Sequence, residues 1–141
     1  HLKKTSSNLL SSMALAQDEA ARRRGITRMC PSSDGNTCRE DGNWNRGWIV
    51  YLDSNANFKP EATEILEMYG ATNEKIRIQA EGAFTFRATF NIDGSPKVSD
   101  GLNAGRFKVC IADDETRAED LQVDEEGWIE ADVSNLACSK V

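Results

Sequence analysis

The chain has 141 residues with a formal net charge of −6, and 39% of its residues are hydrophobic. This length fits one domain, residues 1–141, and the acidic balance argues against nucleic acid as a partner, because phosphate binding needs a basic surface. The sequence contains no run of 18 or more apolar residues, which excludes a membrane-spanning helix within it.

An amphipathic helix is predicted over residues 5–24. Helical spacing places five apolar residues on one stripe: Leu10, Met13, Ala14, Ala20 and Ala21. Arginines 22–24 occupy the last turn, where cations complement the helix dipole. Gly25 can then adopt the positive φ that ends a helix. We expect the apolar face to pack on a sheet and the opposite face to stay polar and available.

Four cysteines are present, namely Cys30, Cys38, Cys110 and Cys138. Their spacing lacks the Cys-x₂₋₄-Cys pairs of zinc sites, so we expect neither a metal nor a cofactor. The even count, with turn formers between the first two, favours disulfides and an oxidising compartment. Three pairings are possible, of which Cys30–Cys38 with Cys110–Cys138 is the simplest. Four buried thiols in a cytosolic protein are the alternative.

Strands are predicted after the helix. Residues 26–30 form a short β-prone run that Pro31 ends, and a turn follows at Asp34-Gly35-Asn36. Residues 48–52 are five consecutive apolar residues, which is typical of a central strand buried on both faces. Residues 62–69 suit either a short helix or a strand.

Two further runs, residues 75–81 and 84–90, alternate apolar and polar residues, and we expect them to pair as a hairpin across Gly82-Ala83. Its inner face would place Phe84, Phe86 and Phe90 in the core. Residues 106–112 and 127–133 are predicted as the last two strands. The acidic segment between them, residues 113–126, is predicted to be a solvated loop.

A calcium loop is a second interpretation of residues 53–64. Asp53, Asn55, Asn57, Glu61 and Glu64 occupy positions 1, 3, 5, 9 and 12 of such a loop. Position 6, where the sharp turn needs Gly, is Phe58. A polar connection with Asx-type turns is the alternative.

This order of elements predicts an α+β fold in which an N-terminal amphipathic helix packs on one face of an antiparallel β-sheet of five to seven strands. The sequence shows neither internal repeats nor βαβ units. It also lacks an internal His and the common nucleophile, phosphate-loop and zinc-helix motifs, so we do not expect an enzyme.

One stretch carries a family resemblance: an Arg-rich helix end, then Met29-Cys30-Pro31-Ser32-Ser33-Asp34-Gly35, Cys38, Trp44, and Gly47-Trp48-Ile49-Val50-Tyr51 with Asp53. It resembles the FimT/FimU minor pilins, which belong with the H-type pseudopilins of type II secretion. The resemblance is specific over residues 16–64 and looser through residues 66–70, 90–94 and the strand at Cys110. The acidic segment 113–126 matches nothing in the family.

The resemblance implies a pilin-like fold, with residues 1–25 as the lower half of the pilin helix and residues 26–141 as a β-rich head. The transmembrane half of such a helix is not contained in this sequence. It implies a minor pilin that primes or caps type IV pilus assembly, anchored in the bacterial inner membrane, facing the periplasm and then assembled into a surface pilus. Its partners would be other minor and major pilins, contacted through Leu9, Leu10, Met13, Gln17 and Arg22.

Three alternatives remain. A type II secretion pseudopilin has the same fold in a different assembly. DNA capture would need a basic patch beside Trp44, and the candidate residues are Arg22, Arg23, Arg24, Arg28, Arg39 and Arg46; the net charge of −6 opposes it. A secreted binding module without a membrane helix is the alternative outside the pilins.

Overall fold

A computed structural model describes residues 2–53, 55, 57, 59–72, 75–82, 84–93, 105–111, 114–124 and 127–134. These residues form one α-helix, eight strands and two short 3₁₀ turns. In chain order they are α1 (Leu2–Arg23), β1 (Thr27–Pro31), η1 (Trp44–Arg46), β2 (Trp48–Leu52), η2 (Ala62–Glu64), β3 (Ile65–Tyr69), β4 (Ile76–Gly82), β5 (Ala88–Phe90), β6 (Gly105–Ile111), β7 (Asp114–Val123) and β8 (Ile129–Ser134).

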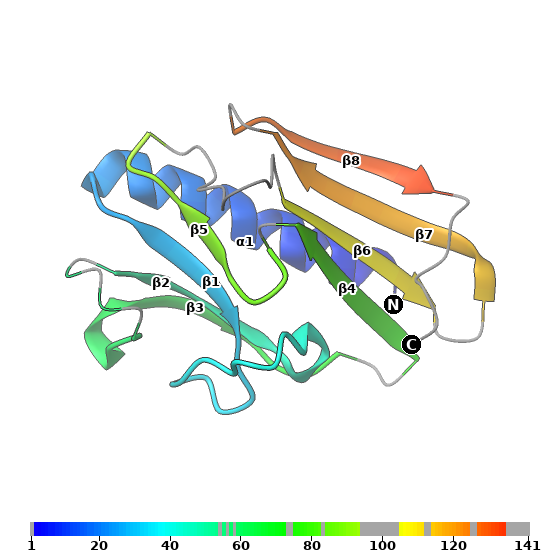
Figure 1. Ribbon diagram of the computed structural model, residues 1–141, viewed down its shortest axis with the longest axis horizontal. Coiled ribbons are helices and arrows are strands. Elements are labelled where there is room, and N and C mark those ends of the chain that lie inside the picture. Colours follow the sequence, from blue (N-terminus) through cyan, green and yellow to red (C-terminus); the bar gives the residue numbers. More distant parts are fainter. Residues whose placement is uncertain are drawn as a thin grey trace.

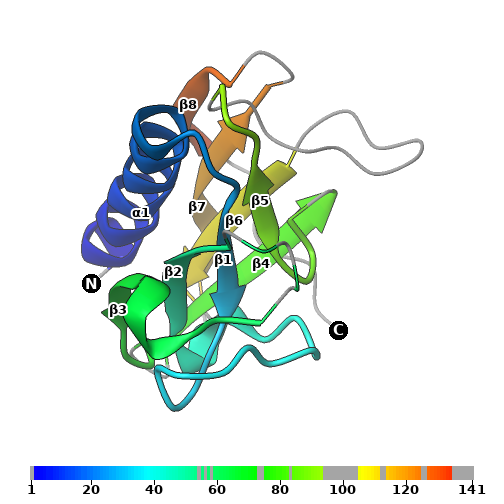
Figure 2. The ribbon, with the colours of Figure 1, turned by 90° about the vertical axis from the view of Figure 1, so that its left-hand side faces the viewer.

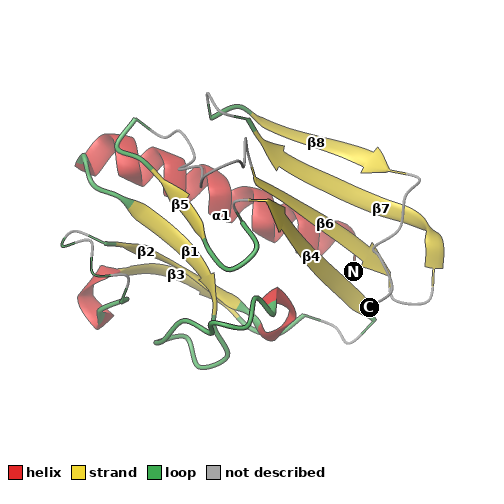
Figure 3. Cartoon of the chain, viewed as in Figure 1, coloured by secondary structure: helices red, strands yellow, loops and turns green. Residues whose placement is uncertain are grey.

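The strands form two sheets, ordered β3-β2-β1-β5 and β4-β6-β7-β8, in which every paired strand is antiparallel. Helix α1 lies on one side of both sheets and contacts strands of each (Figure 1, Figure 2). Colouring by secondary structure shows the helix as a single layer behind the strands (Figure 3). The α+β class is confirmed, but the strands divide into two sheets instead of one.

The end of α1 differs from the prediction by one residue. Arg24, and not Gly25, adopts the left-handed conformation, with φ at +51°. The Gly25 amide then donates to the Ala20 carbonyl at 3.2 Å, the 6→1 bond of a Schellman motif. A Cβ at Gly25 would lie 2.9 Å from Cδ1 of Leu52, so a larger residue there would require the Leu52 side chain to shift.

The buried face of α1 is rotated relative to the predicted stripe. Leu9, Met13, Ala16 and Ala20 have no exposed surface, whereas Ala14 and Ala21, both predicted to be buried, are exposed. The rotation brings hydroxyl-bearing residues into the interface, since Thr5, Ser6 and Ser12 are also buried. The sheets satisfy some of these polar groups, so the face that packs is wider and more polar than an apolar stripe.

Aromatic side chains fill the space where the two sheets meet. Trp44 and Phe107 pack edge to face with ring centroids 4.7 Å apart, and Phe84 packs against both Phe107 and Phe90. Gly105 makes this packing possible, because a Cβ there would lie 2.2 Å from the Phe84 ring. The core therefore depends on the Phe84 ring packing directly against the backbone of Gly105.

The predicted hairpin of residues 75–81 and 84–90 is wrong. Strand β4 pairs with β6, while β5 pairs with β1, so the two runs belong to different sheets. The second strand is also shorter than predicted, and Phe86 is 54% exposed instead of lying in the core. Residues 62–69 divide between the two alternatives, with η2 followed by strand β3.

The acidic segment predicted to be a loop contains β7, the longest strand in the described residues. Strand β7 pairs with β6 on one side and with β8 on the other, which satisfies its backbone on both edges. Leu121 and Val123 are buried in the core while Gln122 between them is half-buried. The charges of this segment obscured the alternation that a half-buried strand requires. The last predicted strand, residues 127–133, is confirmed as β8.

Candidate functional site

The outward face of α1 carries mostly short and polar side chains. Its exposed residues between positions 4 and 21 are Lys4, Ser7, Ser11, Ala14, Asp18 and Ala21. Short side chains let another helix approach the backbone closely, and ridges spaced by four residues suit helix-on-helix packing. This surface, which we call the outer face of α1, is the part of the helix that neither sheet covers.

The residues predicted as a partner interface divide into two groups. Leu9 and Met13 have no exposed surface, because their side chains point from α1 into the core between the helix and the sheets. Leu10 and Gln17 are partly exposed at the edge of the buried face, and the side chain of Arg22 is 64% exposed. Only these last three residues are positioned where another chain can reach them.

Both flanks of α1 are bonded to the head. On the side of the first sheet, Nε1 of Trp48 donates to the Ser12 hydroxyl at 3.0 Å, and the Thr27 hydroxyl donates to the Ala16 carbonyl at 2.7 Å. On the side of the second sheet, Nε2 of Gln17 donates to the Gly127 carbonyl at 2.6 Å. Helix and head therefore form one rigid unit, and the outer face is held in a fixed orientation.

A pocket of about 310 Å³ lies between the first turns of α1 and strands β2 and β3. Its walls are Lys4, Thr5, Asn8, Trp48, Tyr69, Gly70, Ala71 and Thr72. The Trp48 and Tyr69 rings stack with centroids 5.1 Å apart and form the apolar side. The pocket is thus a notch beside the helix, close to the N-terminal end of α1.

The last turn of α1 holds a buried carboxylate. Glu19 is 5% exposed and pairs with Arg22 and Arg23, which project to the surface. Burial raises the pKa of the Glu19 carboxyl, but the hydrogen bonds and charges of Arg23 and Arg22 outweigh it, so the pKa lies below its usual value. Two of the arginines predicted as a complement to the helix dipole therefore also neutralise a buried acid on the same helix.

The first predicted disulfide is confirmed. Cys30 in β1 is bonded to Cys38, with their Cα atoms 5.5 Å apart, and the bridge closes a loop of turn residues. The Tyr51 hydroxyl lies 3.9 Å from Sγ of Cys38, and burial raises the Tyr51 pKa to about 12. Cys110 is buried in β6, but Cys138 lies outside the described residues, so the Cys110–Cys138 pair stays a prediction.

Asp34 organises the disulfide loop from within. Its Oδ1 accepts the backbone amides of Asn36 and Thr37, both at 2.8 Å, and its Oδ2 accepts the Thr37 hydroxyl. These hydrogen bonds, led by the Asn36 amide, hold the Asp34 pKa well below its usual range. Gly35, with φ at +76°, lies under the side chain of Met68 from β3. The loop is therefore preorganised and backed by the neighbouring strand.

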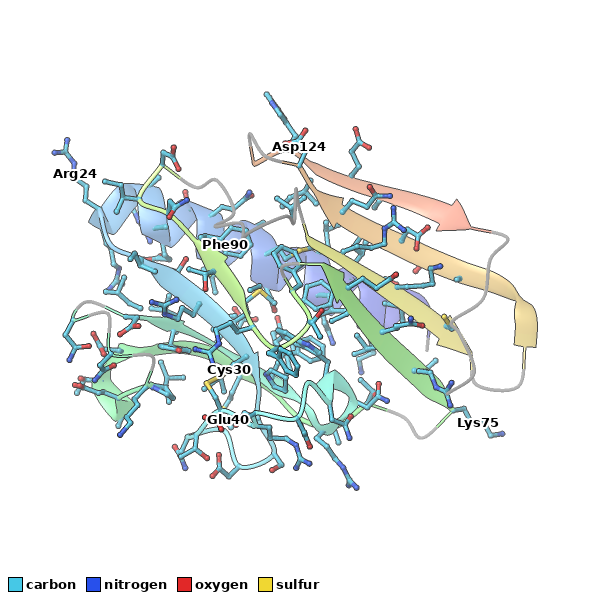
Figure 4. All side chains as sticks on the ribbon, in the orientation of Figure 1. Arg24, Cys30, Glu40, Lys75, Phe90 and Asp124 are labelled. Carbon is cyan, nitrogen blue, oxygen red and sulfur yellow. A yellow bond between two sulfur atoms is a disulfide. The ribbon has the colours of Figure 1, made fainter. Side chains whose placement is uncertain are left out.

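Several residues predicted for a nucleic-acid patch are buried or paired with acids. Arg28 is buried against Asp53, and Arg39 pairs with Asp41, whose pKa its hydrogen bonds lower to about 2. Figure 4 shows Arg24 at the far end of α1, away from Glu40, which follows Arg39 just after the disulfide loop. Trp44 has no exposed surface with which to stack on a base. Arg28 and Trp44 are therefore unavailable to the predicted patch, and Asp41 offsets the charge of Arg39.

The predicted calcium loop has a different role in the structure. Oδ2 of Asp53 accepts from Arg28, and its Oδ1 accepts the Asn57 amide at 3.1 Å. Asn55 donates its side-chain amide to Glu61, at 3.2 Å. Asp53, the first ligand in the motif, is 1% exposed and faces into the protein. The bonds that this segment makes are those of a polar connection.

Among the residues that the structure describes, no three of His, Cys, Asp or Glu are grouped as a metal ion would require. No helix in the same residues has the length and apolar character needed to cross a membrane.

Sequence reasoning did not foresee the Arg28–Asp53 pair or the notch beside α1. An Asp directly after a buried strand was the available signal for the pair, but its partner depends on strand register, which the sequence does not give.

Comparison with known proteins supplies the family. The family model described as type II transport protein GspH matches residues 5–127. Two crystal structures of the type IV minor pilin FimU from Pseudomonas aeruginosa (strain PAO1) share the fold. In space group P21, FimU is 16% identical with a TM-score of 0.69, covering 93% of this chain and 87% of that one. In space group P65, FimU is 14% identical with a TM-score of 0.67, covering 92% of this chain and 91% of that one. No curated protein matches the chain.

Proposed function

The chain belongs to the GspH family, and from that premise we propose that it is a minor pilin, a filament subunit that primes or caps a type IV pilus. It would assemble through contacts between its helix α1 and the helices and heads of other minor and major pilins. The subunit would be anchored in the bacterial inner membrane, with its head in the periplasm, before joining a surface pilus.

The orientation of α1 carries this proposal. One face of the helix is bonded to both sheets, through Trp48 on one flank and Gln17 on the other. The opposite face holds short side chains and is covered by no described part of the chain. A subunit that packs helix against helix needs a helix presented in this way on a head that does not deform.

The partner interface that we propose comprises the outer face of α1 and its two margins. Leu10 and Gln17 form the margin beside the second sheet, and Arg22 lies in the last turn of α1. Leu9 and Met13 are excluded because the chain's own core buries them. A neighbouring subunit would therefore contact mostly small and polar groups, which let two helices approach closely.

Two assemblies use this fold, and the observations favour each differently. Both solved structures are of a type IV minor pilin, which favours a pilus, but their identity of 16% or less establishes the fold alone. The family model is named for a type II transport protein, which supports a secretion pseudopilus as the alternative. DNA capture is less favoured, because Arg28 and Trp44 are buried and Arg39 pairs with Asp41.

Deleting the natural gene separates the two assemblies. A minor pilin predicts that surface pili fall sharply in number while type II secretion continues, and that the intact gene restores the pili. Loss of secreted enzymes with unchanged pili would establish the pseudopilin alternative. If pili and secretion both persist unchanged, the chain is not a subunit of either filament.

A further inference from the structure

The most exposed large apolar side chain in the described residues is Trp128, at the turn between β7 and β8. It is 68% exposed, against 54–59% for Met68, Phe86 and Ile92. Neither of the other two tryptophans is exposed, since Trp44 and Trp48 have 0% and 1% of their surface accessible. An exposed Trp is costly to leave in water, and this residue type is enriched among those that dominate binding energy at interfaces.

Hydrogen bonds fix the turn that presents Trp128. The Trp128 amide donates to Oδ1 of Asp124 at 2.9 Å, and its carbonyl accepts the Asp124 amide at 3.1 Å. The Gly127 amide donates to the Asp124 carbonyl at 3.0 Å, and the Gly127 carbonyl accepts from Gln17 of α1. The indole is therefore carried by a turn that is closed on itself and tied to the helix, which lowers the entropy lost on binding.

Two exposed carboxylates lie close to Trp128 along the chain. Asp124 and Glu130 are both exposed, and strand alternation puts Trp128 and Glu130 on the same face, opposite to Ile129, which packs toward the core. Figure 4 shows Asp124 at the end of β7, pointing away from the body of the molecule. An apolar partner would have to strip water from both carboxylates without replacing those hydrogen bonds, which is unfavourable.

We propose that Trp128, with Asp124 and Glu130, is a docking point for an Arg- or Lys-bearing segment of a neighbouring filament subunit. The inference rests on the proposed function, because it assigns one contact of that same assembly. A guanidinium stacked on the indole gains a cation–π interaction and can donate hydrogen bonds to a carboxylate beside it. The net charge of −6 favours the approach of a basic partner surface from a distance.

The electrostatic part of the proposal can be tested on this chain alone. Because Trp44 and Trp48 are buried, collisional quenching of fluorescence reports mainly on Trp128. We expect the cation caesium to quench Trp128 more efficiently than the anion iodide, relative to free tryptophan, and Glu130→Gln to reduce that difference. Equal quenching by both ions in the wild type would overturn the acidic docking point.

Binding is tested with the purified ectodomains of the other pilin-type subunits encoded by the same organism. We expect Trp128→Ala to weaken binding to one of them about tenfold or more, and Glu130→Gln to weaken it less while reducing its salt dependence. Phe86→Ala, which truncates another exposed ring, is the matched control and should bind normally. Thermal unfolding at the wild-type temperature verifies that each variant is folded.

The outcomes distinguish this inference from the proposed function. If the wild type binds a subunit and Trp128→Ala binds it equally well, the docking point is wrong while the assembly role stands. If Phe86→Ala weakens binding as much as Trp128→Ala, the assignment to Trp128 is also overturned. If the wild type binds none of the subunits, the proposed function itself fails.

Discussion

Nε of Arg28 lies 2.7 Å from Oδ2 of Asp53, and neither residue is more than 1% exposed. Arg28 is in β1 and Asp53 follows β2, the strand beside it. Nη1 of Arg28 also donates to the Thr89 hydroxyl of β5 at 2.9 Å. One buried cation thus links three neighbouring strands at the end of the sheet where the chain passes from α1 into β1.

We predict that Asp53→Ala lowers the free energy of unfolding by about 3–5 kcal/mol, because it leaves the Arg28 guanidinium buried without its counter-charge. Replacing both residues, as Arg28→Met with Asp53→Leu, should recover much of that loss. Urea unfolding followed by circular dichroism measures both variants. A loss below about 1 kcal/mol for the single variant would show that water solvates Arg28.

The bond between Trp48 and Ser12 provides a test of how α1 is attached to the head. We predict that Ser12→Ala costs about 1–3 kcal/mol, because it leaves Nε1 of Trp48 buried without an acceptor. Ser11→Ala is the matched control, since Ser11 is exposed, and should stay within about 0.5 kcal/mol of the wild type. Equal stability of the two variants in denaturant unfolding would contradict the proposed attachment.

Removing the Cys30–Cys38 bridge should destabilise the head by about 2.5 kcal/mol on the loop-entropy model, through greater freedom of the unfolded chain. The variant is Cys30→Ala with Cys38→Ser, measured by denaturant unfolding in oxidising buffer. Proteolysis should then cut first within residues 31–37. Unchanged stability would mean that the hydrogen bonds of Asp34 hold the loop without the bridge.

Asp34 makes a pH-dependent contribution. Since its pKa is lowered on folding, its contribution is fully present above the unfolded pKa near 4 and is lost as the pH falls toward the folded value. The difference in stability between the wild type and Asp34→Asn should therefore shrink between pH 4 and pH 2. Unfolding at each pH measures it, and a constant difference would contradict the hydrogen bonds to the Asn36 and Thr37 amides.

The elements that local chemistry determines were predictable. Five consecutive apolar residues identified β2, and turn formers between Cys30 and Cys38 identified the disulfide loop. The helix was identified as well, but not its orientation, because buried Ser12 and Thr5 count as polar in an apolar stripe. Their cost is offset by bonds and packing that exist only once the sheets are in place.

The failures depend on pairing between distant segments. Residues 75–81 and 84–90 have the pattern of a hairpin, but Phe84 seats against Gly105 and the second run joins β1 instead. Strand β7 is acidic and lacks local β-propensity, and its stability comes from β6 and β8 on either side. The outer face of α1 could not be located from the sequence, because the buried face of the helix is rotated relative to the predicted apolar stripe.

Cysteine cross-linking along α1 tests the assembly account most directly. In cells expressing the chain from its natural gene, Ala14→Cys on the outer face should cross-link to other pilin subunits and still support assembly. Ala16→Cys, whose position has no exposed surface, should give no cross-link, which controls for reaction after unfolding. Cross-links to other pilins from Ala14→Cys alone are the result that we predict. Absence of any such cross-link in cells that still assemble the filament would contradict the account.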